Sequence, residues 1–189
     1  MINSFKWMIV PCCILVGVGA GSALADCGNG SLSGQYASRS QGSVIGVFDS
    51  SGVLHPLATP QIVTGVGQNT FDGNGSFVRS DVAVNSGVTL GSPTPLTDTG
   101  FRDEGGGTYK IDADCTGVMS LFVPGGMEID FAIVVADSGR IVTGTVVKEH
   151  VPALPPAIVP AGTSCDAGTG CSVGVNLLID FTQVSSRRR

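Results

Sequence analysis

Two stretches in which apolar residues recur at every second position constrain the fold of this chain more than any other feature. In the first, every second residue is apolar: Met127, Ile129, Phe131, Ile133 and Val135. Glu128 and Asp130 fall between them, on the opposite side of an extended chain. The second stretch repeats the pattern with Val175, Leu177, Ile179 and Phe181, and places Asn176 and Asp180 opposite. Since successive side chains of a β-strand point to opposite faces, each stretch predicts a strand with one buried face.

Short turn sequences separate the expected strands. "DGNG" at 72–75 predicts a tight hairpin, because Asn and Gly tolerate the positive φ that such turns require. "DSG" at 137–139 predicts another turn. The strands are expected at 34–48, 62–71, 76–85, 106–113, 117–124, 126–136, 140–149 and 173–184. Residues 50–61, with two prolines, are expected as a loop, and 86–100 as another loop with room for a short strand.

This rhythm predicts an all-β fold. Roughly eight strands in consecutive hairpins favour an antiparallel up-and-down β-barrel, which closes on itself and so removes its sheet edges. A β-sandwich is the alternative. The chain holds 28 Gly residues, a composition that suits strands and turns rather than helices.

The N-terminus is typical of an export signal. Lys6 precedes an apolar run, and Ala23-Leu24-Ala25 fits the small-x-small pattern that signal peptidase recognises. We therefore expect a signal peptide at 1–25 and a secreted or periplasmic protein with no transmembrane span after cleavage. The expected organisation is then a single barrel domain at 26–184, with a proline-rich loop insertion at 151–172, and a basic tail at 185–189.

The charge balance argues against nucleic acid as a partner. Asp and Glu number 15, against 10 Lys and Arg, and three of the arginines form the C-terminal tail. The body of the protein is therefore acidic and has no basic stripe of the kind that binds a phosphate backbone.

Four cysteines follow the expected signal peptide: Cys27, Cys115, Cys165 and Cys171. An even number in an exported chain indicates disulfides, and their spacing does not fit a zinc site. Cys165 and Cys171 enclose five small or flexible residues, which allow the chain to double back. We predict that these two pair with each other and that Cys27 pairs with Cys115, unless the bridges are intermolecular.

Few residues suggest catalysis or metal binding. "DADC" at 112–115 places two carboxylates near a strand end, but without the spaced ligands of a calcium loop or a neighbouring histidine. We interpret it as a polar strand end held by a disulfide. His55 and His150 are far apart in sequence and would matter for catalysis only if the fold brought them together. No metal or cofactor is expected.

Several motifs together resemble a group of uncharacterised exported bacterial proteins. They are "LSGQYASRSQG", "NTFDGNGSFV", "GGTYKIDADCTGVMSL" and "IDFAIVVADSGRIVTGTVV", which cover most of the chain after residue 26. The resemblance implies a small β-barrel of the lipocalin-like or allene-oxide-cyclase-like kind, and it implies no particular activity.

Three functions follow as hypotheses. The first is a non-catalytic binding or interaction protein, with an envelope protein as one kind of partner. The second is a lipocalin-like carrier of a small apolar ligand, for which the inward candidates are Phe131, Ile133, Val175 and Phe181. The third, from fold analogy alone, is a cyclase- or isomerase-like enzyme acting in the barrel mouth. A filled interior favours the first, an apolar cavity the second, and a cavity with convergent polar groups the third.

Overall fold

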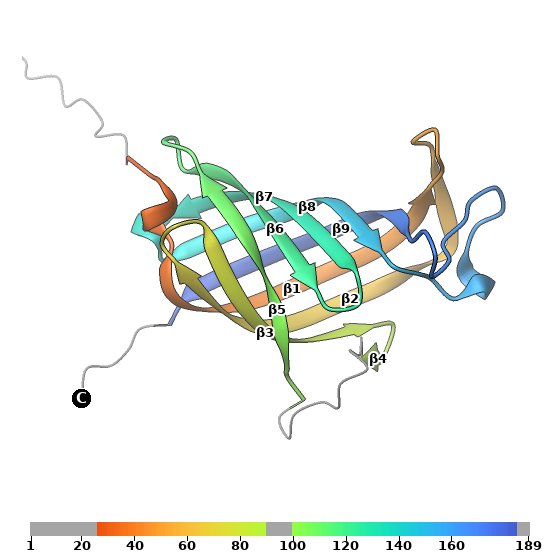
Figure 1. Cartoon of the computed structure of the whole chain (residues 1–189), viewed down its shortest axis with the longest axis horizontal. Helices are drawn as coiled ribbons and strands as arrows, with labels where there is room; N and C mark the ends of the chain where they lie inside the picture. Colours follow the sequence, from red (N-terminus) through yellow and green to blue (C-terminus); the bar gives the residue numbers. More distant parts are fainter. Residues whose placement is uncertain (1–25, 90–99, 185–189) are drawn as a thin grey trace, which may run out of the picture.

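The computed structural model describes residues 26–89 and 100–184, and in these ranges the regular structure is β-sheet apart from three short 3₁₀ turns (Figure 1). The strands are β1 (Ser33–Phe48), β2 (Leu54–Asp72), β3 (Ser76–Asn85), β4 (Val88–Thr89), β5 (Arg102–Ile111), β6 (Thr116–Val123), β7 (Met127–Ala136), β8 (Ile141–Val151) and β9 (Cys171–Gln183).

The strands form a closed antiparallel ring. Consecutive strands pair along the chain, β3 pairs with β5 as well as with the two-residue β4, and β9 returns to pair with β1. Eight of the nine strands therefore make an up-and-down barrel, and the sheet does not split into the two layers of a sandwich. Closure pairs each strand of the ring with two neighbours over most of its length, which removes most of the unpaired edges that would otherwise template association.

The alternating stretches lie where the sequence predicts. On β7, Phe131, Ile133 and Val135 are buried inside the barrel, whereas Glu128 is exposed on the outside. On β9, Leu177, Ile179 and Phe181 face inward and Leu178 faces out. The expected hairpins over 72–75 and 137–139 are also present.

The expected loop at 50–61 is wrong in its second half, because β2 begins at Leu54. The two prolines are tolerated for a geometric reason. Pro56 lies opposite Gly46, and residues 57–60 bulge out before pairing resumes at Gln61. Pairing with β3 starts only at Val63, so this part of β2 has a free edge, where a missing N–H breaks no ladder hydrogen bond.

Other boundaries differ by a few residues. β5 begins at Arg102 and ends at Ile111, so "DADC" forms a turn rather than an extended strand end. The Cys115 N–H donates to the Asp112 carbonyl over 3.0 Å, and Cys115 takes a φ of 69°. β8 and β9 run further than predicted, which shortens the proline-rich loop from 151–172 to 152–170.

The N-terminal segment closes one end of the barrel, called here the plug end (Figure 1). It consists of residues 27–32 and includes the 3₁₀ turn η1 (Asn29–Ser31). The Asn29 side chain accepts a hydrogen bond from the Ile111 N–H over 2.9 Å, and the Tyr109 hydroxyl donates to the Leu32 carbonyl over 2.9 Å. A disulfide ties Cys27 to Cys115. The start of the described chain is thus fixed to strands that come much later in the sequence.

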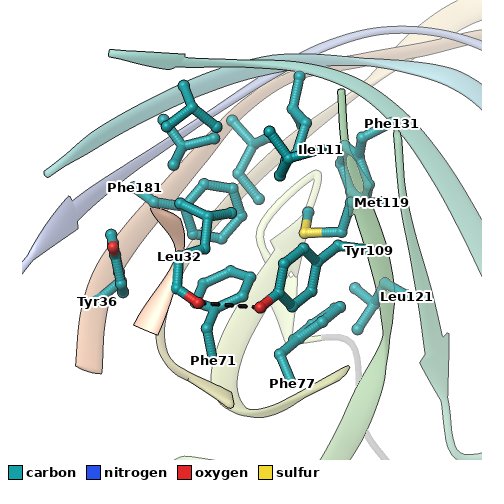
Figure 2. Close-up of a cluster of buried hydrophobic side chains, with 14 of the residues drawn as sticks. Leu32, Tyr36, Phe71, Phe77, Tyr109, Ile111, Met119, Leu121, Phe131 and Phe181 are labelled. Atoms are coloured by element: carbon teal, nitrogen blue, oxygen red, sulfur yellow. Dashed lines mark hydrogen bonds between the residues drawn. The ribbon is translucent and has the colours of Figure 1, made fainter. Parts of the chain in front are cut away.

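An aromatic cluster packs beneath the plug (Figure 2). Its central ring is Phe71, whose centroid lies between 5.1 and 5.9 Å from those of Tyr36, Phe77, Tyr109 and Phe181. Three of these contacts are edge-to-face, an arrangement that aromatic quadrupoles favour. The plug end is therefore a filled hydrophobic core.

Gly139, in the 3₁₀ turn η2 (Asp137–Gly139), completes this end. Its carbonyl accepts a hydrogen bond from the buried Tyr36 hydroxyl over 2.6 Å. Gly139 has a φ of 90°, and a Cβ there would collide with the Ser31 carbonyl. A residue with a side chain would therefore push the turn away from the plug.

The opposite end, called here the far end, is built by the longest strands. β1 and β2, of 16 and 19 residues, extend beyond their neighbours and carry the proline-rich loop 152–170 beside them (Figure 1). This loop contains the 3₁₀ turn η3 (Pro156–Ile158) and is closed by the Cys165–Cys171 disulfide. A second buried cluster packs here: Val44, Val47, Leu57, Val151, Cys165, Cys171 and Val173.

Candidate functional site

Between the two buried clusters lies a central section of the barrel interior whose inward side chains are partly exposed. By strand alternation its inward residues are Ser40, Gly42, Gln61, Val63, Gly65, Ala83, Asn85, Val123, Ile129 and Val175. Each of them is half-buried, whereas the inward residues of the plug end are buried. Solvent therefore reaches the interior at this level, and the central section is the candidate functional site.

A buried ionic cluster lies where the central section meets the plug-end core. Asp81 accepts hydrogen bonds from Arg79 Nε over 3.0 Å and from Arg102 Nη2 over 2.6 Å. Arg79 and Asp81 alternate with Phe77 on the inner face of β3, and both are buried. Burial lowers the pKa of the Arg79 guanidinium, while the neighbouring Asp81 carboxylate acts in the opposite direction.

An amide network adjoins the ionic cluster. Asn69 lies directly opposite Arg79 in the β2–β3 ladder. Its Nδ2 donates to Ser38 Oγ over 2.8 Å, and that hydroxyl donates to the Gly67 carbonyl over 3.2 Å. Gly67 leaves room for this chain, because a Cβ there would lie 3.0 Å from Ser38 Oγ. The small side chains of Ser38 and Gly67 thus leave space inside the barrel for the polar side chain of Asn69.

Three polar atoms of this region are buried without a hydrogen-bond partner: Asn69 Oδ1, Arg79 Nη1 and Asn85 Oδ1. Buried polar groups in native proteins are nearly always paired, and leaving one unpaired costs about 1–3 kcal/mol. All three lie on the inner face of β2 and β3, so this part of the wall has unused hydrogen-bonding capacity.

Glu149 is a second buried charge, on the border of the far-end cluster. On the inner face it lies beside Ile129 of β7 and Val173 of β9, both apolar. Burial raises the pKa of its carboxyl to about 7. An irregular step in the pairing between Asp130 and Phe131, and another between Thr145 and Glu149, bring this residue inward.

The outer wall has its own features. A shallow groove of about 530 Å³ runs beside the exposed ion pair of Arg39 and Asp180, and a smaller hollow of about 190 Å³ lies near Gln68 and Asp103. Several apolar side chains on the outer face are more than half exposed: Ile62, Val66, Val78, Val118, Val147 and Leu178.

The predicted cavity residues fall in different environments. Phe131, Ile133 and Phe181 face inward as expected, but each is at most 2% exposed and packs in the plug-end core. Val175 is partly buried and contacts both clusters, so it lies in the central section. A ligand role for these four stays a prediction, and Val175 is the best placed of them.

Both predicted disulfides are confirmed: Cys27 pairs with Cys115, and Cys165 with Cys171. The carboxylates of "DADC" have local partners. Asp112 pairs with Lys110 over 2.8 Å, and Asp114 Oδ1 accepts from the Thr116 N–H over 3.0 Å. The motif is therefore a structural turn that presents Cys115 to the plug.

The structure does not bring the two histidines together. His55 is on β2 and His150 on β8, and β1 and β9 lie between these strands in the sheet. His55 Nε2 is 2.9 Å from Asp49 Oδ2, and His150 contacts Gly170 at the base of the loop. Within residues 26–89 and 100–184, no group of three or more His, Cys, Asp or Glu side chains is placed to hold a metal ion.

Two disulfides are typical of proteins that fold in an oxidising compartment. In the part of the chain that the structure describes, no helix has the length and apolar character needed to cross a membrane. The predicted signal peptide at 1–25 and the basic tail at 185–189 lie outside the described residues. Comparison with protein-family models, curated proteins and solved structures finds no match for this chain.

Sequence reasoning missed the buried charges. Arg79 and Asp81 follow Phe77 at every second position of β3, so they lie on the same face as this apolar residue. This spacing was the one signal that they face inward. Arg102 lay between the expected loop at 86–100 and the expected strand at 106–113, so no direction was predicted for it. The irregular pairing around residues 146–148 hid the inward direction of Glu149.

Proposed function

We propose that this chain is an exported, non-catalytic binding protein that holds a small, largely apolar ligand in the central section of its barrel. The observation that carries the proposal is the partial exposure of inward apolar residues such as Val63, Val123 and Ile129. These side chains pack against the buried core and still keep apolar surface open, and a ligand site in a small barrel presents such surface to an incoming molecule.

The two ends support the same proposal. The plug end is filled by aromatic rings and fixed by hydrogen bonds and a disulfide, so it forms a rigid floor. Rigid elements position a binding surface more reproducibly than loops do. Export is supported by the two disulfides and by the Ala23-Leu24-Ala25 pattern, and the motif resemblance to exported bacterial barrels agrees with it.

Native mass spectrometry of the protein purified from its own host tests the proposal. We expect a co-purifying small molecule that is released on denaturation. An Ile129→Trp variant would fill the central section and should abolish co-purification, whereas Val134→Trp, on the exposed outer face of the same strand, should not. Bare wild-type protein that also binds no apolar probe in solution would refute the proposal.

The outer wall favours a second candidate, an interaction module for an envelope protein. Val78, Ile62 and Leu178 are 64, 63 and 62% exposed, and exposed apolar groups are common at protein interfaces. If this reading holds, Val78→Glu should abolish chemical cross-linking to a partner in intact cells, while the folded fraction stays unchanged. Unaltered cross-linking in Val78→Glu and in the matching Leu178→Glu would remove it.

A further inference from the structure

Among the side chains that the structure describes, the ionic cluster carries one more positive than negative charge. Two guanidinium groups, from Arg79 and Arg102, share the single carboxylate of Asp81. Both carboxylate oxygens already accept hydrogen bonds: Oδ2 from Arg79, and Oδ1 from Arg102. Asp81 carries a single negative charge and so cannot balance both guanidinium groups, because arginine keeps its proton in proteins.

The surplus charge is buried. The side chains of Arg79 and Arg102 are only 6 and 12% exposed, and Arg79 Nη1 has no acceptor. An unpaired buried charge is among the most unfavourable groups in a protein, because burial removes its hydration. Among the described side chains, Glu149 is a further interior carboxylate, and it is not among the charges that shift the pKa of Arg79, which are those of Asp81 and Arg102.

The two walls around the cluster differ in chemistry. On β1, β2, β3 and β5 the inward residues next to it are small or polar: Ser38, Ser40, Gly65, Gly67, Asn69, Ala83, Gly105 and Gly107. On β6 to β9 the inward residues are apolar except Glu149, which lies opposite Ile129: Met119, Leu121, Ile129, Phe131, Val146, Val175, Leu177 and Ile179. A molecule in the central section would meet a cationic, polar wall on one side and a hydrocarbon wall on the other.

We infer that the ligand is an amphiphile with an anionic head group, a carboxylate in the simplest case, which pairs with the Arg79–Asp81–Arg102 cluster while its apolar body lies against β6 to β9. The inference rests on the proposed function and deepens it. A carboxylate oxygen would accept the unpaired Arg79 Nη1–H, and the bound charge would balance the surplus guanidinium.

Titration calorimetry on the oxidised protein, with residue 26 as its first residue, tests the inference with two probes of equal chain length. Dodecanoate carries the anionic head, and dodecan-1-ol carries a neutral one. We expect dodecanoate to bind more tightly than the alcohol. Arg79→Gln should weaken dodecanoate binding by about tenfold or more, the size of a lost charged hydrogen bond, and leave the alcohol unchanged.

Matched variants separate charge from misfolding. Arg39→Gln removes an arginine from the outer wall, where its side chain is 79% exposed, and should leave both affinities unchanged. Asp81→Asn removes the internal counter-charge and should tighten dodecanoate binding, although it destabilises the unliganded fold. Structural damage would weaken binding in both Asp81→Asn and Arg79→Gln, so opposite effects identify charge as the cause.

The outcomes distinguish the two proposals. Equal binding of the two probes, unaffected by Arg79→Gln, would overturn the anionic head group and leave a neutral apolar ligand. Weaker dodecanoate binding in Asp81→Asn, with near-ultraviolet circular dichroism unchanged, would also overturn it. If neither probe binds and the native protein carries no small molecule, the proposed function itself fails.

Discussion

The two ends of the barrel are closed by opposite means. At the plug end, the first described residues are held by groups that follow much later, and the Cys27–Cys115 bridge spans 88 positions. At the far end, a loop closes onto itself and its bridge spans six positions. The plug end depends on the whole ring being complete, whereas the far end is largely a local structure added to long strands. The same kind of bond therefore has different consequences at each end.

Removing the disulfides one at a time tests this comparison most strongly. On the chain-entropy model, losing the Cys27–Cys115 bridge (C27S/C115S) destabilises the fold by about 4.5 kcal/mol, against about 2 kcal/mol for C165S/C171S, because the first closes the longer loop. Urea unfolding of both variants measures the difference. Equal losses would show that loop length is not what distinguishes the ends.

The cores of the two ends should also respond differently. Phe71→Ala empties the centre of the aromatic cluster and should destabilise the protein by about 4 kcal/mol. Val47→Ala, at a fully buried site of the far-end cluster, should cost about 2 kcal/mol, because it removes less buried surface. Val66→Ala on the exposed face of β2 is the control for Phe71. A Phe71→Ala loss as small as that of the control would contradict a filled plug end.

Glu149 makes stability at the far end depend on pH. Its carboxyl has a pKa of about 7 in the folded chain, above its ordinary value of 4.5, so the unfolded chain loses this proton first. Stability should therefore fall as the pH rises from about 4.5 to about 7, by on the order of 3 kcal/mol. Glu149→Gln should abolish this fall and stabilise the protein at pH 8, as measured by thermal unfolding. Glu128→Gln, on the outer face, should leave the pH profile as it is.

The smallest expected effect concerns a single hydrogen bond of the plug. Asn29→Ala leaves the Ile111 N–H without the acceptor that it has at 2.9 Å, and should cost about 1–2 kcal/mol. Hydrogen exchange of the Ile111 amide should speed up in parallel. Asn176→Ala, exposed on β9, is the matched control. Unchanged exchange at Ile111 would mean that the plug is held without Asn29.

Much of the barrel could be predicted because its signals are local. Alternation on β7 and β9 and the turns at 72–75 and 137–139 give strand positions directly. The tight Cys165–Cys171 spacing also fixes the second disulfide by elimination. The wrong prediction, a loop where β2 begins, concerns a feature that depends on the neighbouring strand. Pro56 is tolerated only because β3 is not yet paired there, and a sequence does not show where a neighbour begins.

The candidate site was less predictable for a related reason. Charged residues in alternating strands are expected on the outer face, so Arg79 and Asp81 are easily assigned to the surface. Only their every-second spacing from the apolar Phe77 indicates that they face inward. Their pairing with Arg102 depends on an irregular register between β3 and β5, which only the assembled sheet defines. Interior charges of this kind become visible once strand register is known.

The pairing of β1 with β9 also has a kinetic consequence. Arg39 and Asp180, bonded across these strands, are 141 positions apart, so the ring cannot close until nearly all of the chain is present. Such non-local contacts slow folding, and we expect refolding in milliseconds to seconds or slower. Until β9 is in place, β1 has an unpaired edge. The ring that the N-terminal plug closes is also incomplete until then. A chain of this kind is compatible with translocation as an unfolded polymer, since its earliest segment reaches its final position among the last.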